Sequence, residues 1–238
     1  MKNLLNAVPI LLLAAMLITS CGNGQAQKRY TALFDGTDLS AWTTNSDDWI
    51  IKDDILVLDS KGDYVMVNDH YLWTREKYGD FVLELDFKVD DEPLFGKEKF
   101  GGEGRPGNSG VFIRVEDPAD PVQTGIEIQV GTIKPGEEPT MNSVGGIFNL
   151  APVTKNMYKP GEWNHYKITC EGSMITVELN GTKTSSADLD EYVTAHKNPD
   201  GSRNKFTRPL KEFARTGYIG LQDHGTPAYF KNIRVKKL

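Results

Sequence analysis

Cysteine is almost absent from this chain, which has only Cys21 and Cys170 among its 238 residues. Cys21 lies at the end of an apolar leader, where we expect lipid to modify it, so no pair of thiols remains for an intramolecular disulfide. Cys170 lies in a run of alternating apolar residues, which is typical of a small buried hydrophobe and not of a nucleophile. A hydrophobic core must therefore stabilise the fold, and the roughly 210 residues after the leader are enough for one large domain.

Positive charge is in deficit, with 27 Lys and Arg residues against 33 Asp and Glu residues and a net charge of −6. Acidity of this size disfavours nucleic acid and anionic polymers as partners, and it suits a neutral ligand such as a sugar. The glycine-rich segment 101–107 lacks the Lys-Ser/Thr ending and the strand–helix context of a phosphate-binding loop. The sequence therefore excludes nucleotide binding through such a loop.

Long apolar runs are confined to the amino terminus. Residues 1–20 begin with the positive charge of Lys2, continue through an apolar stretch and end in Thr19 and Ser20. This pattern is typical of a secretory signal, and it is too short to span a membrane as a mature helix. Residues 17–21, Leu-Ile-Thr-Ser-Cys, also resemble the lipobox of bacterial lipoproteins. A plain secretory signal with an incidental cysteine is the alternative.

We therefore expect three segments: a lipoprotein signal peptide (1–20), the lipidated Cys21 with a flexible tether (21–29), and a single domain (30–238). The N-terminal lipid would be the only contact with a membrane. It would place the protein in the cell envelope, at the outer membrane or facing the periplasm.

Sustained helical periodicity is also missing, and the mature chain alternates apolar and polar residues between closely spaced turns. The predicted strands and hairpins are 30–39, 49–52 with 55–58, 64–67, 81–89, 111–116, 124–130, 163–170 with 174–179, 217–222 and 228–235. Asn180-Gly181 is a strong hairpin-turn signal. This pattern predicts an all-β fold, a two-sheet antiparallel jelly-roll sandwich, with one short helix near 209–213.

Three segments interrupt the alternation. Residues 90–107 and 131–145 are rich in glycine and proline, and long loops of this kind in a compact domain are usually functional or disordered. Residues 187–215 are polar and basic. They are consistent with a lid, but we interpret them as a solvated excursion.

The strand 124–130 is the centre of the functional interpretation. Its apolar residues alternate with Glu127 and Gln129, so that these two polar side chains share the face turned away from the core. The same alternation in 111–116 predicts that Arg114 lies on this face of a neighbouring strand. The last strands contribute Gln222-Asp223-His224-Gly225.

Six motifs occur in the order and spacing of the 3-keto-disaccharide hydrolase family, which this chain resembles over nearly its whole mature length. The motifs are Leu33–Trp42, Gly107–Arg114, Gly125–Gln129, Gly161–Asn164, Leu179–Gly181 and Gly220–Gly225. The resemblance implies a concanavalin A-like lectin/glucanase fold and cleavage of glycosides whose sugar carries a ketone at carbon 3. One departure is Ile126, where the family often has an aromatic residue; this position should face the core.

A ketone at carbon 3 acidifies the proton on carbon 2, so that a base can form an enolate, the aglycone can leave from carbon 1, and water can add afterwards. Such a route requires a base, a group that stabilises the enolate oxygen and an acid for the leaving group. His224 is the first candidate for base or acid. Glu127 is the rival base or an acceptor for sugar hydroxyls. Arg114 is a candidate for holding the enolate oxygen, or equally for a salt bridge with Glu127.

Other polar residues are candidates for substrate binding. Gln129 and Gln222 should contact sugar hydroxyls, and Asp223 could orient His224, although adjacent strand residues point apart. Asn108 could add a polar contact or only form a turn. Trp49 could stack on a sugar or belong to the core.

Neither a cofactor nor a metal is firmly predicted. Glu127, Gln129 and His224 could bind a divalent cation, but no local signature such as HxH supports it. A noncatalytic sugar-binding module and a conventional endoglycanase using Glu127 with Glu116 are the competing functions. For the leading function, a separate sugar 3-oxidoreductase must supply the neutral oxidised substrate.

Overall fold

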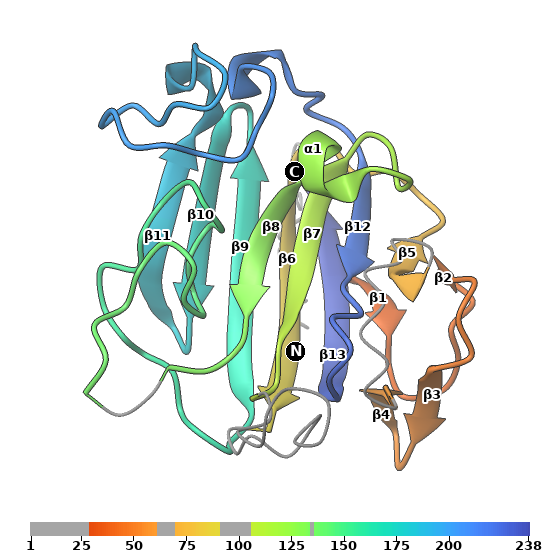
Figure 1. Ribbon diagram of the computed structural model, residues 1–238. Coiled ribbons are helices and arrows are strands. Elements are labelled where there is room, and N and C mark those ends of the chain that lie inside the picture. Colours follow the sequence, from red (N-terminus) through yellow and green to blue (C-terminus); the bar gives the residue numbers. More distant parts are fainter. Residues whose placement is uncertain (1–28, 61–69, 91–105, 134–135) are drawn as a thin grey trace, which may run out of the picture.

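The computed structural model describes residues 29–60, 70–90, 106–133 and 136–238, which form two antiparallel sheets packed face to face (Figure 1). The larger sheet has the strand order β11-β10-β9-β6-β13-β4-β3, with β1 also paired to β13, and the smaller sheet has the order β2-β5-β12-β7-β8. This architecture confirms the predicted all-β sandwich.

The strands of the larger sheet are β1 (Thr31–Phe34), β3 (Trp49–Lys52), β4 (Ile55–Leu58), β6 (Phe81–Val89), β9 (Asn164–Glu171), β10 (Met174–Leu179), β11 (Thr182–Asp188) and β13 (Ala228–Lys237). Those of the smaller sheet are β2 (Trp42–Thr43), β5 (Leu72–Thr74), β7 (Ser109–Val115), β8 (Ile126–Val130) and β12 (Tyr218–Leu221). The named helical elements of the described residues are α1 (Pro121–Thr124) and two 3-10 turns, η2 (Leu189–Glu191) and η3 (Leu210–Glu212). No helix in the described ranges has the length and apolar character that crossing a bilayer requires.

Some predictions concern residues outside the described ranges. These are the leader with Cys21, the strand 64–67 and nearly all of the loop 90–107. The predicted short helix near 209–213 corresponds to the single turn η3.

Two hairpins have the turn chemistry that the sequence predicts. The β3–β4 hairpin turns at Asp53 and Asp54, whose φ angles are 52° and 60°, and Lys52 pairs with Ile55 across it. Asn180 and Gly181, with φ angles of 51° and 79°, join β10 to β11 in the same way. Two successive positive φ angles match the twist of the flanking strands, so these turns fix the strand register.

The core is formed by the inward faces of the two sheets. In the smaller sheet Val111 pairs with Ile128 and Ile113 with Ile126, so that all four apolar side chains project to the same side, and all are buried. Cys170 in β9 is fully buried, as predicted, and burial raises the pKa of its thiol to about 12. The thiol is therefore uncharged and unreactive at neutral pH.

A β-bulge near the end of β7 overturns the prediction for Arg114. Arg114 has a φ angle of +52°, and between β7 and β12 the register shifts because Val115 pairs with Tyr218 while Phe112 pairs with Gly220. The extra residue in β7 moves Val115, which simple alternation would place in the core, to the outer side with Phe112, and it sends Arg114 to the other side.

Arg114 consequently bridges the two sheets instead of facing Glu127. Its guanidinium donates hydrogen bonds to the carbonyl of Gly79 (3.1 Å), the carbonyl of Gly172 (2.7 Å) and the carboxylate of Asp80 (2.9 Å). Gly172 lies in the turn between β9 and β10 of the larger sheet. With 2% of its surface exposed, Arg114 is one of the largest buried residues of the described chain.

We predict that Arg114→Met destabilises the fold, because it leaves two carbonyls and Asp80 without their common donor. Removing one member of a buried charged network should lower the free energy of unfolding by about 3–5 kcal/mol. Chemical denaturation measures the change.

Arg208→Met is the matched control, because Arg208 forms an exposed ion pair with Glu116 (2.6 Å). Its effect should be about 1 kcal/mol or less. Equal losses of stability in the two variants would contradict the bridging role of Arg114.

Candidate functional site

The site lies on the outer face of the smaller sheet, where β7, β8 and β12 meet. Phe112 of β7 pairs with Glu127 of β8, and Gly110 pairs with Gln129. Paired residues project to the same side of a sheet, so Glu127 and Gln129 share the outer face, as the alternation predicts. Gln222 follows β12 directly, and its backbone N–H donates to the carbonyl of Gly110 at 2.9 Å.

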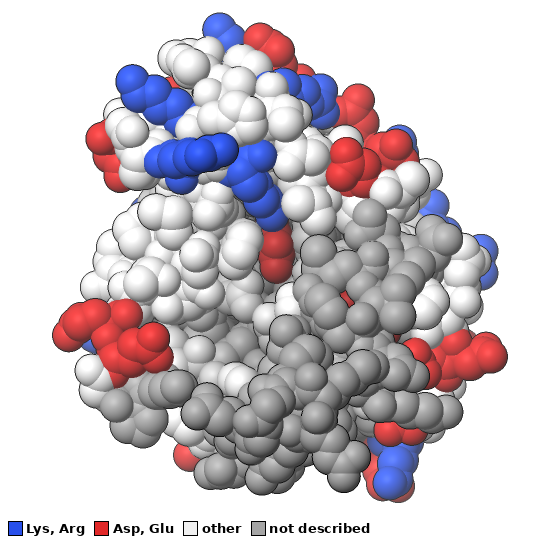
Figure 2. All heavy atoms as spheres, viewed as in Figure 1, with Lys and Arg blue, Asp and Glu red and all other residues white. Residues whose placement is uncertain are grey.

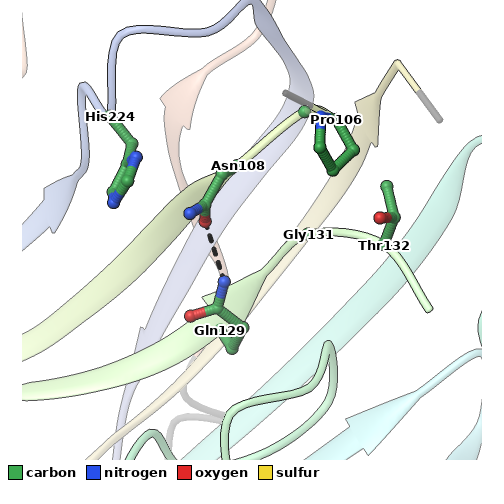
Figure 3. A pocket seen from close by; sticks show the side chains of 7 residues that line it. Pro106, Asn108, Gln129, Gly131, Thr132 and His224 are labelled. Atoms are coloured by element: carbon green, nitrogen blue, oxygen red, sulfur yellow. Dashed lines mark hydrogen bonds between the residues drawn. The ribbon is translucent and has the colours of Figure 1, made fainter. Parts of the chain in front are cut away.

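Two adjoining hollows open on this face. The first, of about 330 Å³, is lined by Asn108, Val122, Glu127, Gln129, Asn142, Phe148, Lys205, Gln222 and His224. The second, of about 290 Å³, is lined by Pro106, Gly107, Asn108, Gln129, Gly131, Thr132 and His224 (Figure 3). We call them the charged lobe and the neutral lobe. Of the eight binding or catalytic residues predicted from the sequence, the lobes contain five: Asn108, Glu127, Gln129, Gln222 and His224.

Glu127 and Lys205 form a buried ion pair in the charged lobe. Lys205 Nζ lies 3.4 Å from Glu127 Oε2, and 19% of the Lys205 side chain and 7% of the Glu127 side chain are exposed. Burial raises the pKa of Glu127 and lowers the pKa of Lys205, and the attraction between the two groups offsets part of each shift. Figure 2 shows an acidic group directly below a basic one in the hollowed part of this face.

Sequence reasoning missed Lys205, because it lies in the basic segment interpreted as a solvated excursion. That interpretation is wrong for the part of the segment around Lys205. Phe206 is buried, and Lys205 Nζ lies 5.4 Å from the centre of its ring and 4.8 Å from that of Phe148. The one sequence signal is a lysine next to an aromatic residue in a polar run, and such pairs are common on surfaces.

Gly110 leaves room for two acceptor oxygens above the strand. A Cβ at this position would lie 2.9 Å from Glu127 Oε1 and 3.2 Å from Gln222 Oε1. Gln222 Nε2 donates to the hydroxyl of Tyr71 at 2.9 Å, whereas its Oε1 is buried and has no hydrogen-bond partner in the described structure. A ligand group that fills this position must therefore supply hydrogen-bond donors, as a sugar hydroxyl does.

Asn108, Gln129 and His224 line both lobes and mark their boundary (Figure 3). Gln129 Nε2 donates to Asn108 Oδ1 at 2.8 Å. The backbone N–H of Asn108 donates to Thr226 Oγ1 (2.8 Å), and that hydroxyl donates to the carbonyl of Asn108 (3.0 Å). The loop that contains His224 is thus tied to the start of β7, so Asn108 both forms a turn and lines the site.

Asp223 lies outside both lobes, so the structure does not bring it together with the other predicted substrate-binding residues. Asp223 Oδ1 accepts the N–H of Gly225 at 2.8 Å, and ligand atoms of Asp223, Asp48 and His70 all lie within 4.8 Å of one another. Burial first, and then the nearby Asp48, raise the pKa of Asp223. The physical reason is that neighbouring residues of an extended chain point to opposite sides.

Asp48, His70 and Asp223 are the one group of His, Cys, Asp and Glu residues in the described ranges that could hold a metal ion. Two oxygen donors and one imidazole nitrogen suit a borderline divalent cation. The cation set expected from the sequence, Glu127, Gln129 and His224, instead lines the charged lobe and already includes an ion pair with Lys205.

Trp49 is a core residue and not a sugar platform. Its ring packs against Phe230 with centroids 6.2 Å apart, and its indole N–H donates to the carbonyl of His70 at 2.7 Å. Trp73 lies on the outer face, where it packs with Tyr71 and Phe112, but it lines neither lobe. An aromatic residue near a strand start does not by itself distinguish a platform from a core position.

The model of the 3-keto-alpha-glucoside-1,2-lyase-like domain matches residues 29–236. The chain belongs to this family. A relative from Bacteroides thetaiotaomicron named 3-keto-disaccharide hydrolase is 24% identical over an alignment of 242 positions, gaps included, which covers 88% of this chain and 78% of the relative. The family assignment confirms the resemblance recognised from the six sequence motifs.

Solved structures agree with this assignment. A protein from Parabacteroides distasonis, provisionally named a glycosyl hydrolase, is 31% identical with a TM-score of 0.72, and the match covers 89% of this chain and all of that one (100%). A second protein of that organism with the same provisional name is 24% identical with a TM-score of 0.63, over 88% and 94% of the two chains. The family supports an enzyme of the glycoside hydrolase type.

We predict that Lys205→Met makes stability depend strongly on pH. Methionine keeps the packing against Phe148 and Phe206 but leaves the buried Glu127 carboxylate without its cation. Because the pKa of Glu127 is raised in the folded state, the unfolded chain releases this proton first as pH rises. The free energy of unfolding should fall from the ordinary carboxyl pKa, about 4.3, upward through the raised pKa. The loss relative to the wild type should reach about 3–5 kcal/mol at neutral pH.

The double variant Glu127→Gln/Lys205→Met is the control, because it removes both charges at nearly constant volume. Its stability at neutral pH should equal or exceed that of the wild type, and the pH slope should disappear. Chemical denaturation of the three proteins between pH 4 and 8 separates these cases. A double variant as sensitive to pH as the single one would contradict the assignment of the slope to Glu127.

Proposed function

We propose that the protein cleaves 3-keto-glycosides, 3-keto-disaccharides among them, by removing the proton on carbon 2, eliminating the aglycone and adding water. The observation that carries the proposal is the buried Glu127–Lys205 pair, which lies in one hollow with His224. The family and the name of the Bacteroides thetaiotaomicron relative support the same substrate class.

The geometry of the pair fits the first step. A base and a cation 3.4 Å apart can act on two adjacent positions of a sugar, the proton on carbon 2 and the oxygen on carbon 3. Glu127 takes the proton, the C2–H electrons form the enolate, and the ammonium of Lys205 stabilises the enolate oxygen. A raised pKa makes Glu127 a stronger base than an ordinary carboxylate. Lys205 therefore takes the role that sequence reasoning gave to Arg114.

His224 completes the elimination. The enolate collapses, the bond between carbon 1 and the aglycone oxygen breaks, and His224 donates a proton to that oxygen. The resulting enone has a double bond between carbons 1 and 2. Water then adds to carbon 1 and gives its second proton to His224, while carbon 2 recovers a proton from Glu127. The sum is one glycoside and one water giving one 3-keto sugar and one alcohol.

A conventional glycosidase mechanism has weaker support. That chemistry needs two carboxylates flanking the scissile bond, about 5–9.5 Å apart. Glu127 is the one carboxylate among the described residues that line the lobes. Glu116, the second carboxylate considered from the sequence, instead pairs with Arg208 on the surface.

We predict that the protein cleaves a 3-keto-disaccharide and leaves the unoxidised parent intact, because only the ketone acidifies carbon 2. Glu127→Gln, Lys205→Met and His224→Ala should each lower kcat/KM by about 100-fold or more. Glu116→Gln is the matched carboxylate control and should retain activity. Product release measured by chromatography tests all of these variants.

Two further outcomes bear on the mechanism. Early product formed in heavy water should carry deuterium at carbon 2, because the proton that Glu127 removes exchanges with the solvent before carbon 2 is protonated again. Cleavage of the parent disaccharide at a comparable rate, or near-normal rates in both Glu127→Gln and His224→Ala, would refute the proposal.

We also propose that lipid on Cys21 anchors the enzyme in the cell envelope and that a separate oxidoreductase forms the ketone upstream. The leader sequence supports the anchor. Cys21→Ser should move the protein from the membrane fraction to the soluble fraction of cells that process lipoproteins. Retention in the membrane fraction would contradict anchoring through this residue.

A further inference from the structure

The two lobes differ in chemistry although they share a wall. The charged lobe contains the ion pair Glu127–Lys205 and the unpartnered acceptor of Gln222. Among the described residues, those that belong to the neutral lobe alone have no charged side chain: Pro106, Gly107, Gly131 and Thr132. All the groups that deprotonate carbon 2 and stabilise its enolate therefore lie on one side of the shared wall.

Asn108, Gln129 and His224 form the boundary that the two lobes share. His224 lines both lobes, and the Gln129–Asn108 hydrogen bond of 2.8 Å closes the wall beside it (Figure 3). The group that protonates the leaving oxygen must reach the bond between the two units of the substrate. His224, at the boundary of the two lobes, can reach that bond, whereas Glu127 and Lys205 line the charged lobe alone.

From this division, and resting on the proposed function, we infer that the neutral lobe is the binding site for the leaving aglycone. The ketone-bearing sugar occupies the charged lobe, and the aglycone lies against Gly131 and Thr132. His224 at the boundary protonates the oxygen that joins the two.

The lining defines the class of aglycone. The described residues that belong to this lobe alone carry no charge, so they suit a neutral group. The hydroxyl of Thr132 is directed into the lobe (Figure 3). The volume of the lobe, about 290 Å³, lies just below the usual range for ligand pockets, about 300–1,000 Å³. The lobe therefore fits one neutral sugar unit and not an extended chain.

Gly131 keeps this lobe open. A Cβ there would lie 3.1 Å from Gln129 Nε2, close to the wall that both units of the substrate would touch. Thr132, by contrast, is half-buried and lines this lobe alone. Thr132 is thus the position at which the aglycone site can be altered while the catalytic groups stay in place.

The test compares two substrates: a 3-keto-disaccharide, which fills both lobes, and the methyl 3-keto-glucoside, whose aglycone is a single methyl group. Thr132→Trp fills the neutral lobe, so the ratio of kcat/KM for the disaccharide to kcat/KM for the methyl glycoside should fall at least about 10-fold. Val122→Trp, in the charged lobe, is the matched control. It should lower activity on both substrates and leave the ratio within about threefold of the wild type.

Thr132→Gln, a smaller addition, serves in place of the tryptophan variant if thermal unfolding shows that the latter does not fold, and it should lower the ratio in the same direction. An unchanged ratio in a folded Thr132 variant that cleaves both substrates would overturn the aglycone assignment. Failure of the wild type to cleave either substrate would instead refute the proposed function, so the two failures are distinguishable.

Discussion

Burial of the Glu127 carboxylate on the outer face of the smaller sheet is the constraint on which the site depends. An ionised carboxylate taken out of water needs a partner, and Lys205 is the cation that meets it. The segment that carries Lys205 must therefore fold back over β8 and not extend into solvent. Phe206 secures this arrangement because its burial fixes the neighbouring residue. A single electrostatic requirement thus explains why a basic, irregular segment becomes part of the site.

The candidate site and the hydrophobic core lie on opposite faces of the smaller sheet. The inner sides of β7 and β8 are apolar and pack against the larger sheet, while their outer sides hold the polar groups of the two lobes. The ion pair adds little to stability, since desolvation offsets most of its attraction, and the unpartnered oxygen of Gln222 costs free energy. Ligand hydroxyls are the natural complement to these acceptors. Such a site persists because the core on the other side of the strands stabilises it.

Apolar and polar residues alternate along the strands with a period of two, and this alternation can be seen in the sequence alone. It predicts the sandwich and most of the residues of the candidate site. Glu127 and Gln129 follow from that alternation directly. Arg114 fails for a specific reason: the β-bulge at a residue with φ +52° reverses the alternation, and the run Ile-Arg-Val contains no glycine that would signal it. Lys205 lies 78 residues from Glu127, and no periodicity connects residues so far apart. Trp49 shows that residue type alone does not separate a platform from a core position.

The loop that contains His224 is fixed from both sides, which a catalytic role requires of a residue outside regular structure. On one side, Ser109 Oγ donates to the carbonyl of Gln222 at 2.7 Å. On the other, the Thr226 hydroxyl bonds both backbone groups of Asn108. Between them, the Asp223 carboxylate accepts the N–H of Gly225, whose φ angle of +77° suits a glycine. Asp223 thus shapes the loop that contains His224. In the motif 222–225, Gln222 therefore lines the charged lobe and His224 lines both lobes. Asp223 holds the turn, and Gly225 permits it.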